Sequence, residues 1–276
     1  MPDFWTHILG GELVLKDLDD EYIKNKIRGN RKLFYFGCQG PDFFLYNDFW
    51  PWKKNKRGPE AGKMIHESDF RDFFSCSMDY IKLDNLETLH VYFYGVLCHY
   101  VFDKCLHPFI YARTKNFKEH KILESSLDIL LVSKLWQERA YKLPPVRAID
   151  IGSELPVEIE EYYRYLLSTL FDYSPRVDFI NDSYVDMKKV MSIFYSPQKY
   201  KRIAIKILNK LLPMDISIYM YPRQIDVNFL TIDEKKEVYS LLNKACYEGV
   251  NLIKLVNSGA SADLIEYLPR VSFIGE

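Results

Sequence analysis

The sequence predicts an all-α fold, built as a single compact multi-helix domain over residues 1–276. Long segments place apolar residues at helical spacing. Strand-like alternation is confined to Ile216–Tyr221, which has no partner strand with which to form a sheet. The chain is 48% hydrophobic and 27% charged, a composition that favours an ordered chain with a sizeable core. These observations together indicate one compact domain of packed helices.

The first long helix is expected over Asp84–Leu106, where acidic residues precede a segment that is apolar almost all round. Such a helix belongs in the core. The His107-Pro108 pair is expected to end it, because the residue before a proline avoids the helical region. Asn116 is expected to cap a second helix over Phe117–Tyr141, which Pro144-Pro145 closes.

Further helices are expected in the second half of the chain, at Val157–Phe171, Val185–Phe194, Gln198–Leu212 and Ile232–Ser258, with a short one after Ala260. Segments rich in proline and glycine predict long loops at Gly37–Gly62 and Leu143–Pro156. Long loops in compact domains are often functional. The part bearing the candidate ligands is therefore about residues 1–128, and residues 150–276 form a helical remainder.

Charge and cysteine content exclude several classes of protein. With 37 basic and 38 acidic residues the net charge is −1, so nucleic acid is not the expected partner, although a local basic patch stays open. No apolar segment is long enough to span a bilayer, and the N-terminus lacks the features of a secretory signal. The five cysteines form no CxxC pair. We expect reduced thiols in a cytoplasmic protein.

A stripe of metal-type ligands stands out on the first long helix. His99, Asp103 and His107 follow one another at intervals of four residues, which places them on one helix face. His120 and Glu124 repeat this spacing on the next helix. One such pair alone is more often a surface ion pair or a satisfied core histidine. A carboxylate in an apolar helix between two histidines, however, favours a divalent cation, and zinc suits this donor set.

With three further segments, these residues resemble the zinc-dependent phospholipases C of bacteria and, more distantly, the fungal zinc single-strand nucleases. The further segments are the Gly37-Cys-Gln-Gly-Pro-Asp42 motif, His66, and Asp3-Phe-Trp-Thr-His7. The resemblance covers about residues 3–128. It implies a helical fold, two or three zinc ions and hydrolysis of a phosphoester.

The resemblance also implies a role for each residue. One zinc ion would be held by His66, His99 and Asp103, with Asp42 at or beside it. A second would be held by His107, His120 and Glu124. A third would take His7 and the other oxygen of Asp103. Asp42 would be the catalytic general base or would orient the attacking water.

The third zinc ion of the family also takes an N-terminal tryptophan. Here Trp5 is internal, so the amine of Pro2, exposed if Met1 is removed, is the expected substitute. His90 lies off the stripe and is not expected to be a ligand. Cys98 and Cys105 are expected to be small buried thiols. Asp128 is expected to orient His120 or to extend the polar stripe.

Two neighbouring segments bear on the substrate, a small phosphodiester or a phospholipid. The aromatic segment Asp42–Trp52 could cage a quaternary ammonium group, touch a membrane surface or stack on bases, but packing over the helices as a lid is the favoured interpretation. The run Lys53–Arg57 could steer an anion or be a solvated loop. Three other functions stay open: a zinc protein without catalysis, an intracellular nuclease or nucleotide phosphodiesterase, and a metal-free helical interaction module.

Overall fold

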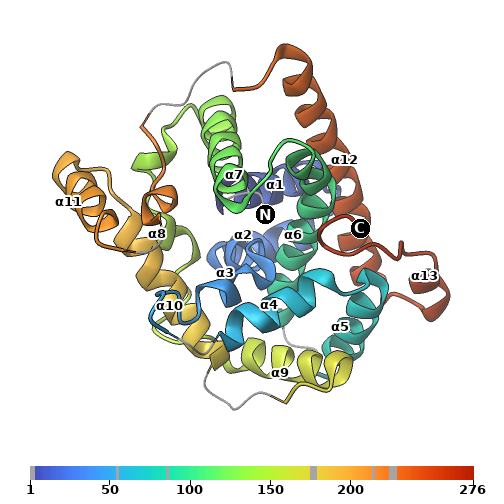
Figure 1. Cartoon of the computed structure of the whole chain (residues 1–276). Helices are drawn as coiled ribbons and strands as arrows, with labels where there is room; N and C mark the ends of the chain where they lie inside the picture. The colour runs from blue at the N-terminus through green and yellow to red at the C-terminus, as the bar shows by residue number, and fades with distance from the viewer. Residues whose placement is uncertain (1–3, 54–55, 85–86, 175–178, 213–214, 224–228) are drawn as a thin grey trace.

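All regular elements are helical in the computed structural model, which describes residues 4–53, 56–84, 87–174, 179–212, 215–223 and 229–276. The prediction of an all-α fold is confirmed (Figure 1). The α-helices are α1 (Phe4–Asp17), α2 (Glu21–Gly29), α3 (Arg31–Gly37), α4 (Arg57–Glu67), α5 (Phe70–Asp84), α6 (Glu87–Tyr111), α7 (Phe117–Leu131), α8 (Pro145–Ile149), α9 (Val157–Phe171), α10 (Phe179–Phe194), α11 (Lys199–Asn209), α12 (Ile232–Asn257) and α13 (Ala262–Glu266). Shorter turns are the 3₁₀ helices η1 (Gly40–Tyr46), η3 (Ala140–Lys142) and η4 (Ile216–Tyr219) and the π-helical turn η2 (Val132–Trp136).

Helix α6 is the central element and is buried along most of its length, as predicted. It packs against α1, α3 and α12, which surround it (Figure 1). Its expected end at His107-Pro108 is wrong, because the helix continues through Pro108 to Tyr111. Proline removes one backbone donor but leaves its own carbonyl free, and that carbonyl accepts from Ala112 N–H at 3.1 Å. His107 therefore lies within the helix, on the same face as His99 and Asp103.

Two glycines let α3 and α6 cross at backbone contact. A Cβ on Gly37 would lie 2.1 Å from the Tyr92 carbonyl oxygen, and one on Gly95 would lie 2.4 Å from that of Phe34. No larger residue fits at either position. The close crossing holds the segment after α3, which includes Asp42, beside the ligand-bearing face of α6.

The second long helix begins as predicted and ends early. Asn116 caps α7 by accepting a hydrogen bond from Glu119 N–H at 3.0 Å. The expected extent to Tyr141 is wrong, because the α-helix ends at Leu131 and a π-helical turn follows. Gln137 then adopts a left-handed conformation (φ 56°), which turns the chain away from the helix axis.

The remaining predictions vary in accuracy. The helix predicted at Val157–Phe171 has those bounds in the structure, and α11, α12 and α13 lie close to their expected positions. Helix α10 begins six residues before the predicted Val185. The strand-like alternation at Ile216–Tyr221 forms no strand, in agreement with the all-α prediction: its first four residues form η4, where Asp215 accepts from Ser217 N–H at 3.2 Å.

The first 84 residues contain more structure than periodicity indicates. Helices α1 to α5 lie there, and the loops expected at Gly37–Gly62 and Leu143–Pro156 contain η1, the start of α4 and the short α8. Helix α1 escapes a periodicity test because it is buried on nearly every side, so no polar face marks its turns.

One large core unites most of the helices, and a second small cluster lies between α10, α11 and η4. All five cysteines are buried free thiols, which agrees with the prediction for Cys98 and Cys105. Among the described residues, no helix has the length and apolar character needed to cross a membrane.

Candidate metal centre

Five elements bring the candidate ligands together around α6. The central helix contributes His99, Asp103 and His107 from three successive turns. Helix α1 contributes His7, η1 contributes Asp42 and α4 contributes His66. Helix α7 contributes His120 and Glu124. The eight residues form three groups in which the potential ligand atoms lie within 4.8 Å of one another.

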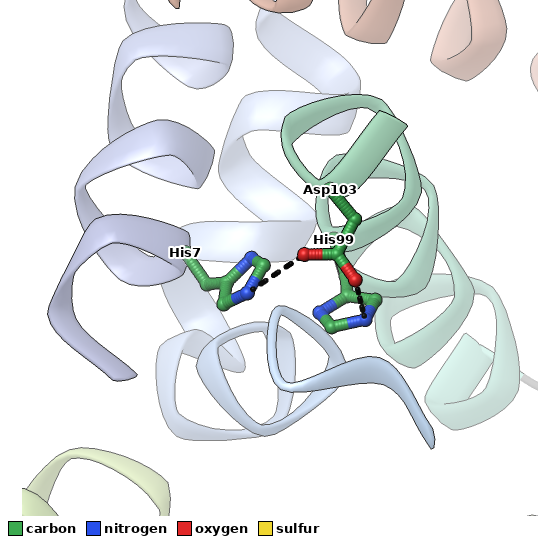
Figure 2. Close-up of side chains that lie close together, drawn as sticks. All are labelled: His7, His99 and Asp103. Atoms are coloured by element: carbon green, nitrogen blue, oxygen red, sulfur yellow. Dashed lines mark ion pairs between the residues drawn. The ribbon is translucent and has the colours of Figure 1, made fainter. Parts of the chain in front are cut away.

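The first group consists of His7, His99 and Asp103, all fully buried (Figure 2). The two oxygens of Asp103 face different imidazoles. Oδ1 lies 3.3 Å from Nε2 of His7, and Oδ2 lies 3.2 Å from Nε2 of His99. A carboxylate with both oxygens directed at imidazole nitrogens has the geometry needed to serve two cations at once.

The second group consists of Asp42, His66 and His99. Asp42 Oδ1 lies 3.1 Å from His66 Nε2 and 4.0 Å from His99 Nε2. His66 Nε2 is also 3.8 Å from Asp103 Oδ2. The first two groups are therefore continuous, with His99 in both and Asp103 between them.

The third group consists of His107, His120 and Glu124. His120 Nε2 lies 2.9 Å from Glu124 Oε1, and the rings of His107 and His120 are 6.0 Å apart. His107 and Glu124 are buried, and His120 is partly buried. This group lies between α6 and α7, as expected from the i,i+4 spacing of the candidate ligands on the two helices.

Whether these residues fit a metal can be judged from their buried polar atoms that have no hydrogen bond. Among the described residues, they include His99 Nε2, His66 Nε2, Asp42 Oδ1, both oxygens of Asp103 and both ring nitrogens of His7 and His107. Burying such groups without partners costs free energy, and a concentration of them in one place is exceptional in a stable fold. Imidazole nitrogen and carboxylate oxygen are zinc donors, so the residues fit zinc ions.

The protonation states also favour cations. Burial would raise the pKa of Asp103, but the neighbouring His99, His107 and His7 outweigh it and hold that pKa well below its usual range. Burial lowers the pKa of His99, and it lowers that of His107 strongly. Asp103 is therefore ionised and the imidazoles of His99 and His107 are neutral, the forms that bind metal. At His7 and His66 burial is outweighed by Asp103 and Asp42 respectively and the pKa is raised, so these two positions stabilise positive charge.

Comparison with known protein families agrees with this geometry. The model of a family described as zinc dependent phospholipase C matches residues 6–176, more than half of the chain and all eight candidate residues. The chain belongs to the zinc-dependent phospholipase C family. Membership implies a zinc-dependent hydrolase whose substrate is a lipid or another small phosphoester. Searches of curated proteins and of solved structures return no match.

Two backbone carbonyls orient histidines in this member of the zinc-dependent phospholipase C family. His66 Nδ1 donates to the Gly62 carbonyl oxygen at 2.6 Å, and His99 Nδ1 donates to that of Cys38 at 3.2 Å. A carbonyl can only accept, so Nδ1 carries the proton in each ring. The Nε2 lone pairs are then directed into the site, as zinc ligation requires.

Two further residues shape the site, Gly40 within the motif at residues 37–42 and Phe273 far from any motif. Gly40 has a φ of 50°, and a Cβ there would lie 2.3 Å from the His99 ring, so only glycine fits. Phe273 packs its ring against His66 and His99, at 5.7 and 6.0 Å between centroids. Its N–H donates to the His66 carbonyl oxygen at 3.1 Å. Only tertiary structure brings residue 273 to this wall.

Asp128 holds the start of α1, a role that sequence reasoning missed. Its carboxylate accepts from Trp5 N–H and Thr6 N–H at 2.7 Å each, from the Thr6 hydroxyl, and from the Tyr221 hydroxyl at 2.6 Å. The first N–H groups of a helix lack partners within the helix, and a carboxylate there also complements the helix dipole. Asp128 thereby fixes the helix that positions His7.

A cavity of about 740 Å³ lies against the ligand groups. Asp42, His120 and Glu124 line it directly, and Lys56, Lys115 and Lys121 add positive charge. Aromatic residues form much of the remaining wall: Phe4, Tyr46, Phe49, Tyr111, Phe117 and Tyr219. The cavity thus joins the candidate ligands to a surface with both apolar and cationic character.

The other sequence-predicted features lie as follows. In the aromatic segment, Phe43 and Phe44 are core residues, while Trp52 is exposed and stacks on Trp50 at 5.2 Å. The segment therefore belongs partly to the core rather than forming a separate lid. Lys56 donates to the carbonyl oxygens of Asp48 and Trp50, which ties the basic run to this segment.

His90 is half-buried beside Tyr94 and belongs to none of the three ligand groups, as expected. Its pKa is lowered, first by burial and then by the charge of Lys26. The proposed ligand Pro2 and residues 54–55 of the basic run lie outside the described residues. Their predicted roles stay predictions.

Proposed function

We propose that this protein hydrolyses a phosphodiester with two or three zinc ions bound at the three groups. The proposed ligands are His66, His99, Asp103 and Asp42 for one ion, His107, His120 and Glu124 for a second, and His7 with Asp103 for a third. One observation carries this proposal: five imidazoles and three carboxylates converge beside a cavity that three of the eight residues line.

Zinc ions bound at these residues would lower the pKa of water and polarise phosphoryl oxygens. Asp42 is the proposed general base. One of its oxygens faces His66 and His99, and its side chain also lines the cavity, so it can orient a water molecule and accept its proton. In His66 and His99, the backbone contacts described above place the proton on Nδ1 and leave Nε2 as the ligand nitrogen.

The cavity walls support a phospholipid or a small phosphodiester as substrate. Lys115 and Lys121 offer positive charge to a phosphate group, and aromatic rings offer an apolar surface to the rest of the molecule. Lys121 Nζ also lies 3.8 Å from Glu124 Oε2, so the lysine stands next to a proposed ligand. Its charge there favours an anionic substrate group over a cationic one.

The test combines zinc content with turnover. Protein purified without added metal or chelator should contain two or three zinc equivalents and should cleave bis(p-nitrophenyl) phosphate or a phospholipid. Asp42→Asn should retain at least part of the zinc and lose turnover by about 10²-fold or more, the range typical of a lost general base. Asp172→Asn is the matched control, because Asp172 is exposed at the end of α9 in a left-handed conformation that asparagine tolerates.

Each other result would replace the proposal with a defined alternative. Bound zinc without turnover on any diester would indicate a zinc protein without catalysis. Turnover of nucleotide diesters alone would indicate a nucleotide phosphodiesterase. Folded protein that takes up no zinc would indicate a helical interaction module.

A further inference from the structure

Helix α11 lies at the edge of the molecule and beyond the residues that match the family (Figure 1). One side of it is anchored. Ile205 is buried in the small cluster that also contains Val190, Phe194, Ile216 and Met220. Lys201 Nζ donates to the carbonyl oxygens of Ser192 at 2.8 Å and Tyr195 at 2.6 Å. The helix is thus fixed to the body by its inner face.

The opposite face of α11 is apolar and exposed. The exposed fractions are 73% for Tyr200, 50% for Ile203, 59% for Ile207, 42% for Leu208 and 77% for Leu211 in the turn that follows. At about 100° per residue these positions share an arc of about 140° on the helical wheel. A surface helix normally turns such an arc toward the core, whereas no part of the chain that the structure describes covers this one.

The charge of the segment points to the nature of that partner. Residues 198–212 contain five basic residues and no acidic one: Lys199, Lys201, Arg202, Lys206 and Lys210. On the wheel, Lys199, Lys206 and Lys210 border one side of the apolar arc, and Lys201 borders the other. Apolar residues flanked by lysines match the acyl and phosphate layers of an anionic membrane surface.

We propose that α11 is an interfacial helix that docks the protein on an anionic lipid bilayer. Ile203, Ile207 and Leu211 enter the boundary between headgroups and acyl chains. Lys199, Lys206 and Lys210 extend outward to the lipid phosphates while their methylene stems cover apolar surface. A protein partner would need a matching acidic rim around an apolar groove, whereas an anionic bilayer supplies both features everywhere.

The position of α11 relates this surface to the cavity. Helix α11 packs against η4, and Tyr219 of η4 lines the cavity while its ring contacts Phe49 at 4.9 Å. A bilayer bound at α11 would therefore be coupled to one wall of the cavity through a single short turn. Membrane docking does not depend on the proposed hydrolysis, because it is measured without turnover.

The experiment measures sedimentation of the full chain with vesicles. Vesicles of phosphatidylcholine alone are compared with vesicles that also contain phosphatidylglycerol. The wild type should bind the anionic vesicles, and added salt should weaken binding. The triple variant Ile203→Ser, Ile207→Ser, Leu211→Ser should lower the partition coefficient on the order of a hundredfold. Lys206→Gln and Lys210→Gln should each lower it roughly fivefold.

Matched controls lie on α12. Ile232 is 74% exposed, and Lys254 is also exposed, so Ile232→Ser and Lys254→Gln should leave vesicle binding unchanged. Circular dichroism and zinc content should be unchanged in all variants, and so should turnover of a soluble diester. If the wild type itself does not turn over a soluble diester, the proposed hydrolysis is refuted, and the vesicle-binding measurement is unaffected.

Any of three results would overturn the docking proposal. The first is that the wild type does not bind anionic vesicles, and the second is that the triple variant binds them as tightly as the wild type. The third is that the wild type is a dimer in solution and that the triple substitution dissociates it, which would assign the apolar face to a second copy of the chain.

Discussion

Replacing Asp128 tests how the first helix is held over the metal centre. In Asp128→Ala, two N–H groups of the first turn of α1 lose their acceptor, which costs about 1–2 kcal/mol by analogy with helix caps. The hydroxyls of Thr6 and Tyr221 lose a charged acceptor, at about 1 kcal/mol each. The free energy of unfolding should therefore fall by about 3–4 kcal/mol.

The assay is urea unfolding of zinc-saturated protein, because bound zinc adds stability that must be equal in both samples. Fluorescence is a suitable probe, since Trp5 is buried in α1 and contacts Trp136 at 5.8 Å. Asp128→Asn retains an acceptor and the side-chain shape, so its loss should be about half as large. Zinc content should fall in Asp128→Ala, because α1 carries His7.

A double-mutant cycle isolates one bond. Tyr221→Phe should cost about 1 kcal/mol in the wild type and almost nothing in Asp128→Ala, since the acceptor is then already absent. If Asp128→Ala cost less than about 1 kcal/mol, the carboxylate would not hold the start of α1 and the reasoning would be refuted. If the two changes were additive, the Tyr221 hydroxyl would not contribute to this site.

Three further predictions concern the glycine at the site, the metal and pH. Gly40→Ala should cost about 2 kcal/mol or more in urea unfolding and should lower zinc content, because a Cβ there meets the His99 ring at a left-handed φ. Gly29→Ala, with open space around it, is the control that should cost nothing. Removing zinc with a chelator should lower the thermal midpoint by about 10 °C, and added zinc should restore it; an unchanged midpoint would argue against bound zinc. Asp215 beside Lys118 has its pKa lowered to about 2, chiefly by hydrogen bonds from Lys118 and Ser217. Its stabilisation is therefore present above its ordinary pKa of 3.8 and is lost as the pH falls through about 2. Asp215→Ala should destabilise by no more than about 0.5 kcal/mol at neutral pH, with no difference in strong acid.

Local spacing was enough to predict the parts of the site that lie within one helix. The i,i+4 stripes of α6 and α7 follow from helix geometry, and both helices exist with their ligands on a shared face. The placement of His7, Asp42 and His66 beside them came only from family resemblance, because three separate elements supply them. Nothing in the local sequence ties His66 to Phe273, since that contact exists only after the chain has folded.

The fold shows the same division between local and tertiary information. The cap at Asn116 is a local hydrogen bond and was predictable. The continuation of α6 through Pro108 was not, because a buried helix retains its neighbouring contacts when one backbone donor is missing. The alternation at Ile216–Tyr221 belongs to a 3₁₀ turn, because alternating apolar residues also fit a turn that packs on two sides, and the missing partner strand was the information that excluded a sheet.

The position of Asp103 between two ligand groups has a consequence for how the protein would acquire its ions. One oxygen of Asp103 faces His7 and the other faces His99, so under the zinc assignment proposed above an ion bound to one oxygen would change the charge that the other oxygen presents to the neighbouring ion. The two binding equilibria are linked, and the linkage is reciprocal. The affinity for either ion would therefore depend on whether the other is bound, so zinc titrated into metal-free protein would not fill these two groups independently.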